Sequence, residues 1–301
     1  MLSKKPNAKK QTLTYAAAML AVVLWASSFP GTRYVLQYYS PVVIMLMRFS
    51  AATATLIIVG LVRKIRLPKM KDLPMFVASG LSGVFLYSFF FNTGSVTVEA
   101  GVSSFIIAAS PVFTLCLARV FLKEVMRPMC WIGMGVSIAG LAAVTLTQTA
   151  GFVFNTGVLL MIAASVFSGA YSFVVRVLTK TYTALEVTVY TMIFGTVGMF
   201  AFLPDVIREV PESNLSVNLI VVFLGIFPAG IAYLAWGYAL SKADKTAHVT
   251  VFSYLIPFVS TLIGFVWLRE TLTAWALAGG LVIIAGMMMT NIRLTGKNGQ
   301  P

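Results

Sequence analysis

The sequence predicts an all-α integral membrane protein with ten transmembrane helices, arranged as two inverted repeats of five. Three observations lead to this prediction. The 301 residues are 59% hydrophobic and only 10% charged, whereas soluble domains are about 45–50% apolar and about 25% charged. The apolar residues form blocks long enough to cross a bilayer. The phrase PVFTLCLARVFLKE, residues 111–124, returns 146 positions later as PFVSTLIGFVWLRE, residues 257–270.

Each apolar block supplies about the 20 residues that a transmembrane helix needs. The start of the chain, with basic residues before an apolar run, has the pattern of a secretory signal peptide. However, the run is long and no small-residue cleavage pattern comes after it, so we expect it to remain as the first span. The predicted spans are 13–32, 41–62, 73–92, 100–122, 129–147, 156–178, 186–204, 216–238, 246–268 and 273–292.

Basic residues predict the orientation of these spans. With a cytoplasmic N-terminus, all but four of the 22 Lys and Arg residues lie on the inner side. The exceptions are Arg33, Arg208 and Arg269 on the outer side and Arg48 within the second span. Because cytoplasmic loops are enriched in Lys and Arg, both termini are predicted to be cytoplasmic. The net charge of +13 is spread over linkers instead of forming a basic domain, so we expect no nucleic-acid partner.

The repeated phrase belongs to a longer repeat. At the same offset of 146, Tyr87 matches Tyr233 and Gly133 matches Gly279. Each half holds five spans, an odd number, so the second half enters the membrane from the opposite side. Such inverted repeats characterise secondary transporters. The predicted units are an N-terminal cytoplasmic tail at 1–12, a first repeat at 13–147, a linker at 148–155, a second repeat at 156–292 and a C-terminal cytoplasmic tail at 293–301.

Pro111 and Pro257 occupy equivalent positions in the fourth and ninth spans, near the expected middle of the bilayer. Proline removes a backbone donor and bends a helix. Freed backbone groups are tolerated within a membrane only inside protein or beside a water-filled cavity. Single prolines are also common packing kinks in membrane helices. The matched pair favours two hinges or kinks beside a midplane cavity between the halves.

The ordered set of motifs resembles a known family. It comprises LWASSFPGTR at 24–33, SPVVIMLMRF at 40–49, Pro-x12-Glu in the fourth and ninth spans, and GxxxxxxG in the fifth and tenth. Together these are similar to the drug/metabolite transporter superfamily, EamA type, over essentially the whole chain. The resemblance implies ten helices, a central cavity lined mainly by spans 1, 3, 4, 6, 8 and 9, and transport of small metabolites, including amino-acid export in some members. The second half departs from the pattern, because Ser168 stands at the position of Trp25 and Thr191 at that of Arg48.

Small polar and aromatic side chains in these spans are the candidates for binding a substrate. Ligand pockets are mainly apolar and aromatic, with a few placed polar groups. Stripes of small polar residues also serve helix packing, and Tyr and Trp also gather at membrane interfaces. The candidate cavity residues are Trp25, Ser28, Tyr87, Phe91, Asn92, Ser110, Ser168, Tyr171, Tyr233, Trp236, Tyr238, Thr250 and Tyr254.

Four charged or titratable residues are further candidates. Arg48 lies within a span, where charges are costly and commonly functional; it could bind a substrate carboxylate or act structurally through carbonyls or the interface. Arg33 and Arg176 match near helix ends and are interpreted as gate or interface residues. His248 could titrate near neutrality, although a lone interfacial histidine is commonly inert. Arg269 and Glu270 are interpreted as turn or capping charges.

The favoured function is a secondary transporter that moves a small organic metabolite, preferably by exporting an amino acid. A nucleotide-sugar or organic-cation carrier of the same fold is the alternative, although no acidic residue lies deep in a span to suit a cation. A multi-pass membrane enzyme is the alternative of another class, but it would need clustered acid–base or metal-binding residues. With Cys116 and Cys130 in or beside apolar segments, we expect no disulfide, metal or cofactor. The expected partners are a small-molecule substrate and membrane lipid; a monomer is compatible with the sequence, and the expected location is a bacterial inner membrane.

Overall fold

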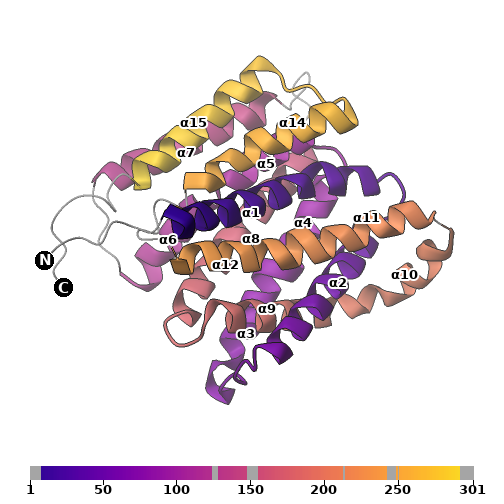
Figure 1. Ribbon diagram of the computed structural model, residues 1–301. Coiled ribbons are helices and arrows are strands. Elements are labelled where there is room, and N and C mark those ends of the chain that lie inside the picture. Colours follow the sequence, from indigo (N-terminus) through magenta and orange to yellow (C-terminus); the bar gives the residue numbers. More distant parts are fainter. Residues whose placement is uncertain are drawn as a thin grey trace, which may run out of the picture.

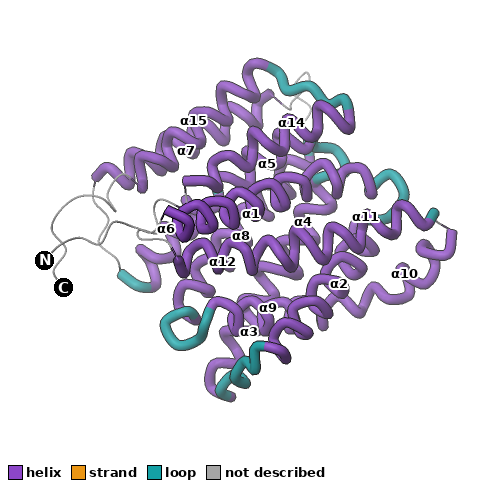
Figure 2. Tube along the Cα trace, in the orientation of Figure 1, coloured by secondary structure: helices purple, strands orange, loops and turns teal. Residues whose placement is uncertain are grey.

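The computed structural model describes residues 8–123, 128–147, 155–212, 214–242, 249 and 251–291. Every regular element in these ranges is a helix, and none is a strand (Figures 1 and 2). Eight of the described helices are long and apolar enough to cross a membrane. Two shorter apolar helices, Phe252–Leu268 and Ala274–Thr290, complete the set. The predicted all-helical membrane class is therefore confirmed.

The first half of the chain begins with long helices whose limits follow local sequence signals. Helix α2 starts at Pro41, where a proline is tolerated because the first turn of a helix has no partner for its N–H groups. The preceding Ser40 is extended. The elements are α1 (Ala8–Val35), α2 (Pro41–Val62), η1 (Met70–Asp72), α3 (Leu73–Gly80), η2 (Leu81–Leu86), α4 (Tyr87–Gly94), α5 (Ala100–Ala108), α6 (Ser110–Phe121) and α7 (Pro128–Thr147).

The second half has a similar order of elements. Helix α9 begins with a capping box, in which Thr183 Oγ1 accepts from the Glu186 amide and Glu186 Oε2 accepts from the Thr183 amide; this satisfies two donors at the helix start. The elements are α8 (Thr156–Leu178), α9 (Ala184–Met199), η4 (Phe200–Phe202), α10 (Leu203–Glu209), η5 (Val210–Glu212), α11 (Leu215–Ile226), η6 (Phe227–Ile231), α12 (Ala232–Lys242), η7 (Val251–Leu255), α14 (Ile256–Leu268) and α15 (Ala274–Asn291).

The two halves are interrupted at matching places. The segments η2 and η6 are both π-helical, and they begin 146 positions apart. The helices α6 and α14 each carry a proline, Pro111 or Pro257, in their first turn. The residue directly before each of these helices has a ψ near zero, −7° at Ala109 and −17° at Leu255. The predicted proline sites therefore coincide with interruptions of the helices, whereas the π-helical segments were not expected from the sequence.

Helices from the two halves pack against each other throughout the described chain. Helices α7 and α15 make the most extensive pairwise contact and lie side by side (Figure 1). Glycine permits this approach, because a Cβ at Gly133 would lie 2.6 Å from the carbonyl oxygen of Gly286. Helix α1 packs on α12 and α14, while α8 packs on α4 and α6. The first helix of each half therefore packs on the segments that come after the interruptions in the other half.

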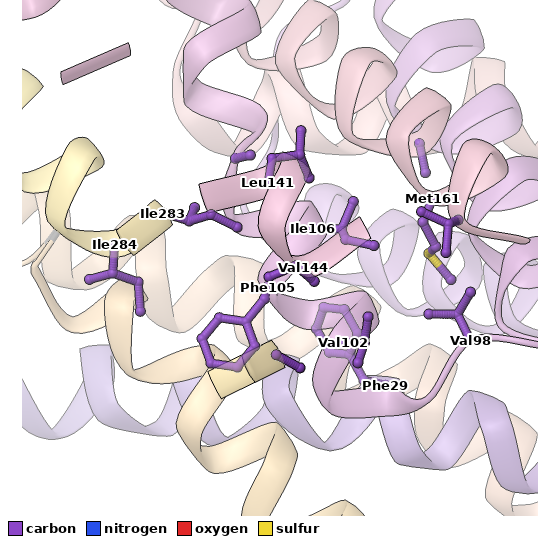
Figure 3. Packing of buried hydrophobic residues seen from close by; sticks show 14 of the residues in the cluster. Phe29, Val98, Val102, Phe105, Ile106, Leu141, Val144, Met161, Ile283 and Ile284 are labelled. Carbon is purple, nitrogen blue, oxygen red and sulfur yellow. The ribbon is translucent and has the colours of Figure 1, made fainter. Parts of the chain in front are cut away.

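The largest hydrophobic core joins the two halves around α5. Phe105 on α5 is fully buried, and the ring lies close to Gly280 of α15, where a Cβ would meet it at 2.3 Å. Large apolar side chains also remain on the outside, such as Trp275 at 78% exposure, as expected for a surface covered by lipid. Figure 3 labels ten members of this core: Phe29, Val98, Val102, Phe105, Ile106, Leu141, Val144, Met161, Ile283 and Ile284.

Candidate functional site

Arg48 is a buried cation that the described chain leaves without an acidic partner. Its side chain on α2 is only 8% exposed. Its Nη2 donates to Ser28 Oγ at 2.9 Å and its Nη1 to Thr32 Oγ1 at 3.3 Å. These two hydroxyls lie one turn apart on the same face of α1. The Nε of Arg48 is buried and has no hydrogen-bond partner, and no described carboxylate lies within ion-pair distance of the guanidinium.

Two tyrosines from equivalent positions converge on Arg48. Tyr87 is the first residue of α4, directly after η2, and Tyr233 is the second residue of α12, directly after η6. Both interact electrostatically with Arg48 and with each other. A π-helical turn holds an extra residue and rotates the helix that comes after it, and such turns are frequent at functional sites. The interruptions therefore set where these two side chains lie.

Aromatic rings extend the cluster from Arg48 along α1, α4 and α12. Trp25 meets the Tyr233 ring edge-to-face, with centroids 5.4 Å apart, and lies 5.2 Å from Trp236. Tyr87 stacks on Phe91 with centroids 5.6 Å apart. Tyr171 of α8 interacts electrostatically with Tyr233. We call the set Trp25, Ser28, Thr32, Arg48, Tyr87, Phe91, Tyr171, Tyr233 and Trp236 the arginine–aromatic cluster.

Helix α8 packs against the proline interruption of the first half. A Cβ at Gly169 would lie 2.7 Å from the carbonyl oxygen of Ser110. Thr114 Oγ1, one turn into α6, donates to the Gly169 carbonyl at 3.1 Å. Ser110 is therefore part of the α6–α8 contact, and Ser168 is the neighbour of the glycine that allows it. Both serines are half-buried.

The remaining predicted cavity residues make other contacts or fall outside the described residues. Asn92 is buried, and its Nδ2 donates to the carbonyl of Pro41 at 3.1 Å, which joins α4 to the start of α2. Tyr238 is 37% exposed on α12. Tyr254 in η7 packs against the core around α5. Thr250 and His248 fall outside the residues that the structure describes.

Arg33 and Arg176 lie at the ends of α1 and α8. The Nε of Arg33 forms an ion pair with Glu270 Oε1 at 2.8 Å, and its Nη1 donates to the carbonyls of Ser95 and Val96, both at 2.7 Å. Arg176 lies in the last turn of α8 and is exposed. The sequence singled out Arg33 but gave no signal for its partner, because Glu270 is 237 positions away.

The arginine–aromatic cluster contains groups that can bind and orient a solute. Within the described ranges, no group of three or more His, Cys, Asp or Glu residues could hold a metal ion. The cluster instead offers one guanidinium, several hydroxyls and a set of aromatic rings. An apolar wall with a few placed polar groups is typical of small-molecule binding sites.

A multi-pass helical protein whose two halves are interrupted alike around such a cluster belongs to the class of membrane transporters. The chain is a member of the EamA-like transporter family, whose model matches residues 12–146 and again residues 155–292. The resemblance seen in the sequence motifs is therefore confirmed. The protein is a multi-pass transporter of the plasma membrane and not an enzyme.

Curated relatives cover nearly the whole chain. A "probable terminal-alkyne amino-acid exporter" from Streptantibioticus cattleyicolor is 37% identical over 93% of this chain and 94% of its own length. An uncharacterized transporter from Archaeoglobus fulgidus is 32% identical over 89% of this chain and 95% of its own. A solved crystal structure shares the fold with a TM-score of 0.65 at 21% identity, covering 95% of this chain and 99% of the other.

Proposed function

We propose that the protein is a secondary transporter that exports an amino acid or a closely similar small metabolite. In this proposal ten helices cross the membrane as two inverted five-helix repeats, with both termini in the cytoplasm. The repeats rock around a substrate cavity near the middle of the bilayer, which opens to one side at a time. The arginine–aromatic cluster lines that cavity.

One observation carries the proposal: Tyr87 and Tyr233, which are equivalent in the two halves, converge on the same buried arginine. A substrate held between equivalent elements of two inverted repeats can be exposed to either side by a rearrangement of one repeat against the other. The half-buried rings of Trp25, Tyr87 and Tyr233 support a lined space. The printed name of the Streptantibioticus cattleyicolor relative supports an amino acid as the substrate and export as the direction.

Counterflow in proteoliposomes tests this proposal. Vesicles loaded with one unlabelled amino acid at a time, beginning with L-leucine and L-phenylalanine, would receive the same labelled amino acid from outside. We expect transient accumulation with the wild-type protein and a loss of about tenfold or more in Tyr87→Ala and Tyr233→Ala, since hot-spot aromatic contacts are worth about 2 kcal/mol or more. Pro257→Ala should slow transport, because a straight ninth span cannot bend at that point.

The matched control is Tyr38→Ala, which makes the same truncation at an exposed tyrosine. It should leave counterflow at the wild-type rate. Equal rates in Tyr38→Ala and Tyr87→Ala would show that the cluster does not bind the substrate. The absence of counterflow for every amino acid would overturn the proposed substrate and direct the search to sugars, nucleosides and organic cations.

A further inference from the structure

We propose that Arg48 is the anchor for a carboxylate group on the transported solute, an inference that rests on the proposed function and specifies its substrate class. None of the described carboxylates forms an ion pair with Arg48. A guanidinium is charged at every physiological pH, and Arg48 holds that charge with 8% of its surface exposed. Within the described part of the chain its hydrogen-bond partners are two neutral hydroxyls, Ser28 and Thr32.

Neutral hydroxyls orient the guanidinium but do not neutralise it. Burying an uncompensated ion carries a large desolvation cost, and residues that retain such a charge in a membrane segment are usually functional. The bonds from Nη1 and Nη2 to one face of α1 fix the plane of the group. The Nε donor is left buried and without a partner. Two of the five N–H donors of the guanidinium thus hold the side chain in place, and its Nε donor is still to be satisfied.

A carboxylate matches this unpaired donor and the excess charge together. The guanidinium presents parallel N–H groups that bind both oxygens of a planar carboxylate. Tyr87 and Tyr233 interact electrostatically with Arg48, and in this proposal their hydroxyls donate further hydrogen bonds to the same oxygens. These donors come from α2, α4 and α12, so a bound carboxylate would contact both halves of the protein.

The neighbouring aromatic rings determine what the rest of the solute can be. The ring centroid of Trp25 lies 5.4 Å from that of Tyr233 and 5.2 Å from that of Trp236. Their faces suit an apolar side chain, and they can also attract an ammonium group through cation–π interaction. The class of solute is therefore a small carboxylate with an apolar body. An α-amino acid and a simple carboxylic acid share this chemistry.

The test compares carboxylate with carboxylate-free probes on the purified, full-length protein. The probes are L-leucine and 4-methylpentanoate, which carry a carboxylate, and L-leucinamide and isoamylamine, which do not. Ligand binding to the folded state raises Tm, so Tm against probe concentration gives the affinity for each. We expect the wild type to prefer the carboxylates by about 10- to 100-fold, as for one charge-assisted hydrogen-bonded contact. In Arg48→Gln this preference should disappear.

Two further variants make the result specific to Arg48. Arg63→Gln makes the same change at an exposed arginine and should keep the wild-type preference. Arg48→Lys keeps the charge without the planar fork, so it should fold if the glutamine variant does not and show an intermediate preference. The affinities for all four probes are measured on one preparation of each variant. The ratio of carboxylate to carboxylate-free affinity is therefore independent of how much of that variant is folded.

The outcomes separate this inference from the proposed function. Three results would overturn the assignment of Arg48 as the carboxylate anchor. They are a preference for carboxylates that persists in Arg48→Gln, a preference in Arg48→Lys that is as large as in the wild type, and a wild type without any preference among the probes. Arg48-dependent binding of both carboxylates without counterflow of any amino acid would support the anchor and refute amino-acid transport. Binding of L-leucine but not of 4-methylpentanoate would support the anchor and identify the amino acid as the source of the carboxylate.

Discussion

Glu270 joins three parts of the chain with its two carboxylate oxygens. Oε1 accepts from Arg33 at the end of α1, and Oε2 accepts from the Ala100 amide at the start of α5, both at 2.8 Å. The second contact places a negative charge at a helix N-terminus, where it is favourable. The preceding Arg269 has φ of +59°, so the chain turns there and directs Glu270 back toward α5. The capping interpretation made from the sequence is compatible with this geometry.

Glu99 lies beside this ion pair and predicts a pH dependence of stability. Partial burial, and then the nearby Glu270 carboxylate, raise the pKa of Glu99 above its ordinary value. The folded protein therefore holds this proton more tightly than the unfolded chain. The stability that the protonated group contributes is complete below the unfolded pKa of about 4.3 and is lost as pH rises through the folded pKa. Glu99→Gln, which is always neutral, should raise Tm at pH 7 but have little effect at pH 4.

Thermal unfolding of the detergent-solubilised protein at the two pH values measures this difference. Comparing the variant with wild type at the same pH removes the effects of other titrating groups. In a Glu270→Gln background the rise in Tm that Glu99→Gln produces at pH 7 should be smaller, because the Glu270 carboxylate, one cause of the raised pKa of Glu99, is gone. A gain of equal size at pH 4 and pH 7 would contradict the explanation.

At the scale of elements, the α7–α15 pair depends on close backbone approach. Gly133 faces the Gly286 carbonyl across the pair, whereas Gly135, two residues along α7, has nothing within 4 Å of an added Cβ. Gly133→Ala should therefore lower the free energy of unfolding by about 1–3 kcal/mol, as expected for overpacking. Gly135→Ala should leave it unchanged or raise it by up to about 1 kcal/mol, since alanine favours a helix.

Denaturant titration in mixed micelles would measure both glycine variants. The two substitutions add the same methyl group to the same helix, so their difference isolates the steric contact with α15. Equal losses of stability in both variants would show that the contact between α7 and α15 is not the reason for the glycine at position 133.

The interrupted helices show how far the sequence predicts the site. The two prolines marked the interruptions, and the spans 41–62 and 156–178 coincide with α2 and α8. The π-helical segments were not predicted, although η6 contains Pro228. The η2 segment has no proline, and its geometry depends on neighbours: a Cβ at Gly83 in η2 would lie 2.2 Å from the ring of Tyr171. The seventh span was expected as one helix over 186–204. Instead α9 ends at Met199, and the short elements η4 and α10 come after it.

At the scale of the whole molecule, the inverted topology predicts opposite locations for equivalent loops. Arg63 comes after the second span of the first repeat, and Arg208 comes after the second span of the second repeat. Both are exposed. The distribution of all Lys and Arg residues predicts a cytoplasmic N-terminus. In that orientation Arg63 is cytoplasmic and Arg208 is on the outer side. The same position in the two repeats would then face opposite compartments.

Single cysteines introduced at these positions measure the topology, after replacement of Cys116 and Cys130 by serine. A membrane-impermeant maleimide added to intact cells should label Arg208→Cys and not Arg63→Cys. Inside-out vesicles should give the reverse pattern. Labelling of both positions from one side would contradict the inverted repeat, and exchange of the two patterns would contradict the cytoplasmic termini.

The sequence by itself determined the membrane class, the limits of most helices, the two proline interruptions and the family resemblance. These properties depend on composition and on local periodicity, which can be read along the chain. Only the tertiary structure decided that Ser28 and Thr32 orient Arg48, that Tyr87 and Tyr233 converge on it, and that Glu270 is the partner of Arg33. Those contacts join residues on different helices, and their distances depend on how π-helical turns and glycine contacts rotate each helix against its neighbours.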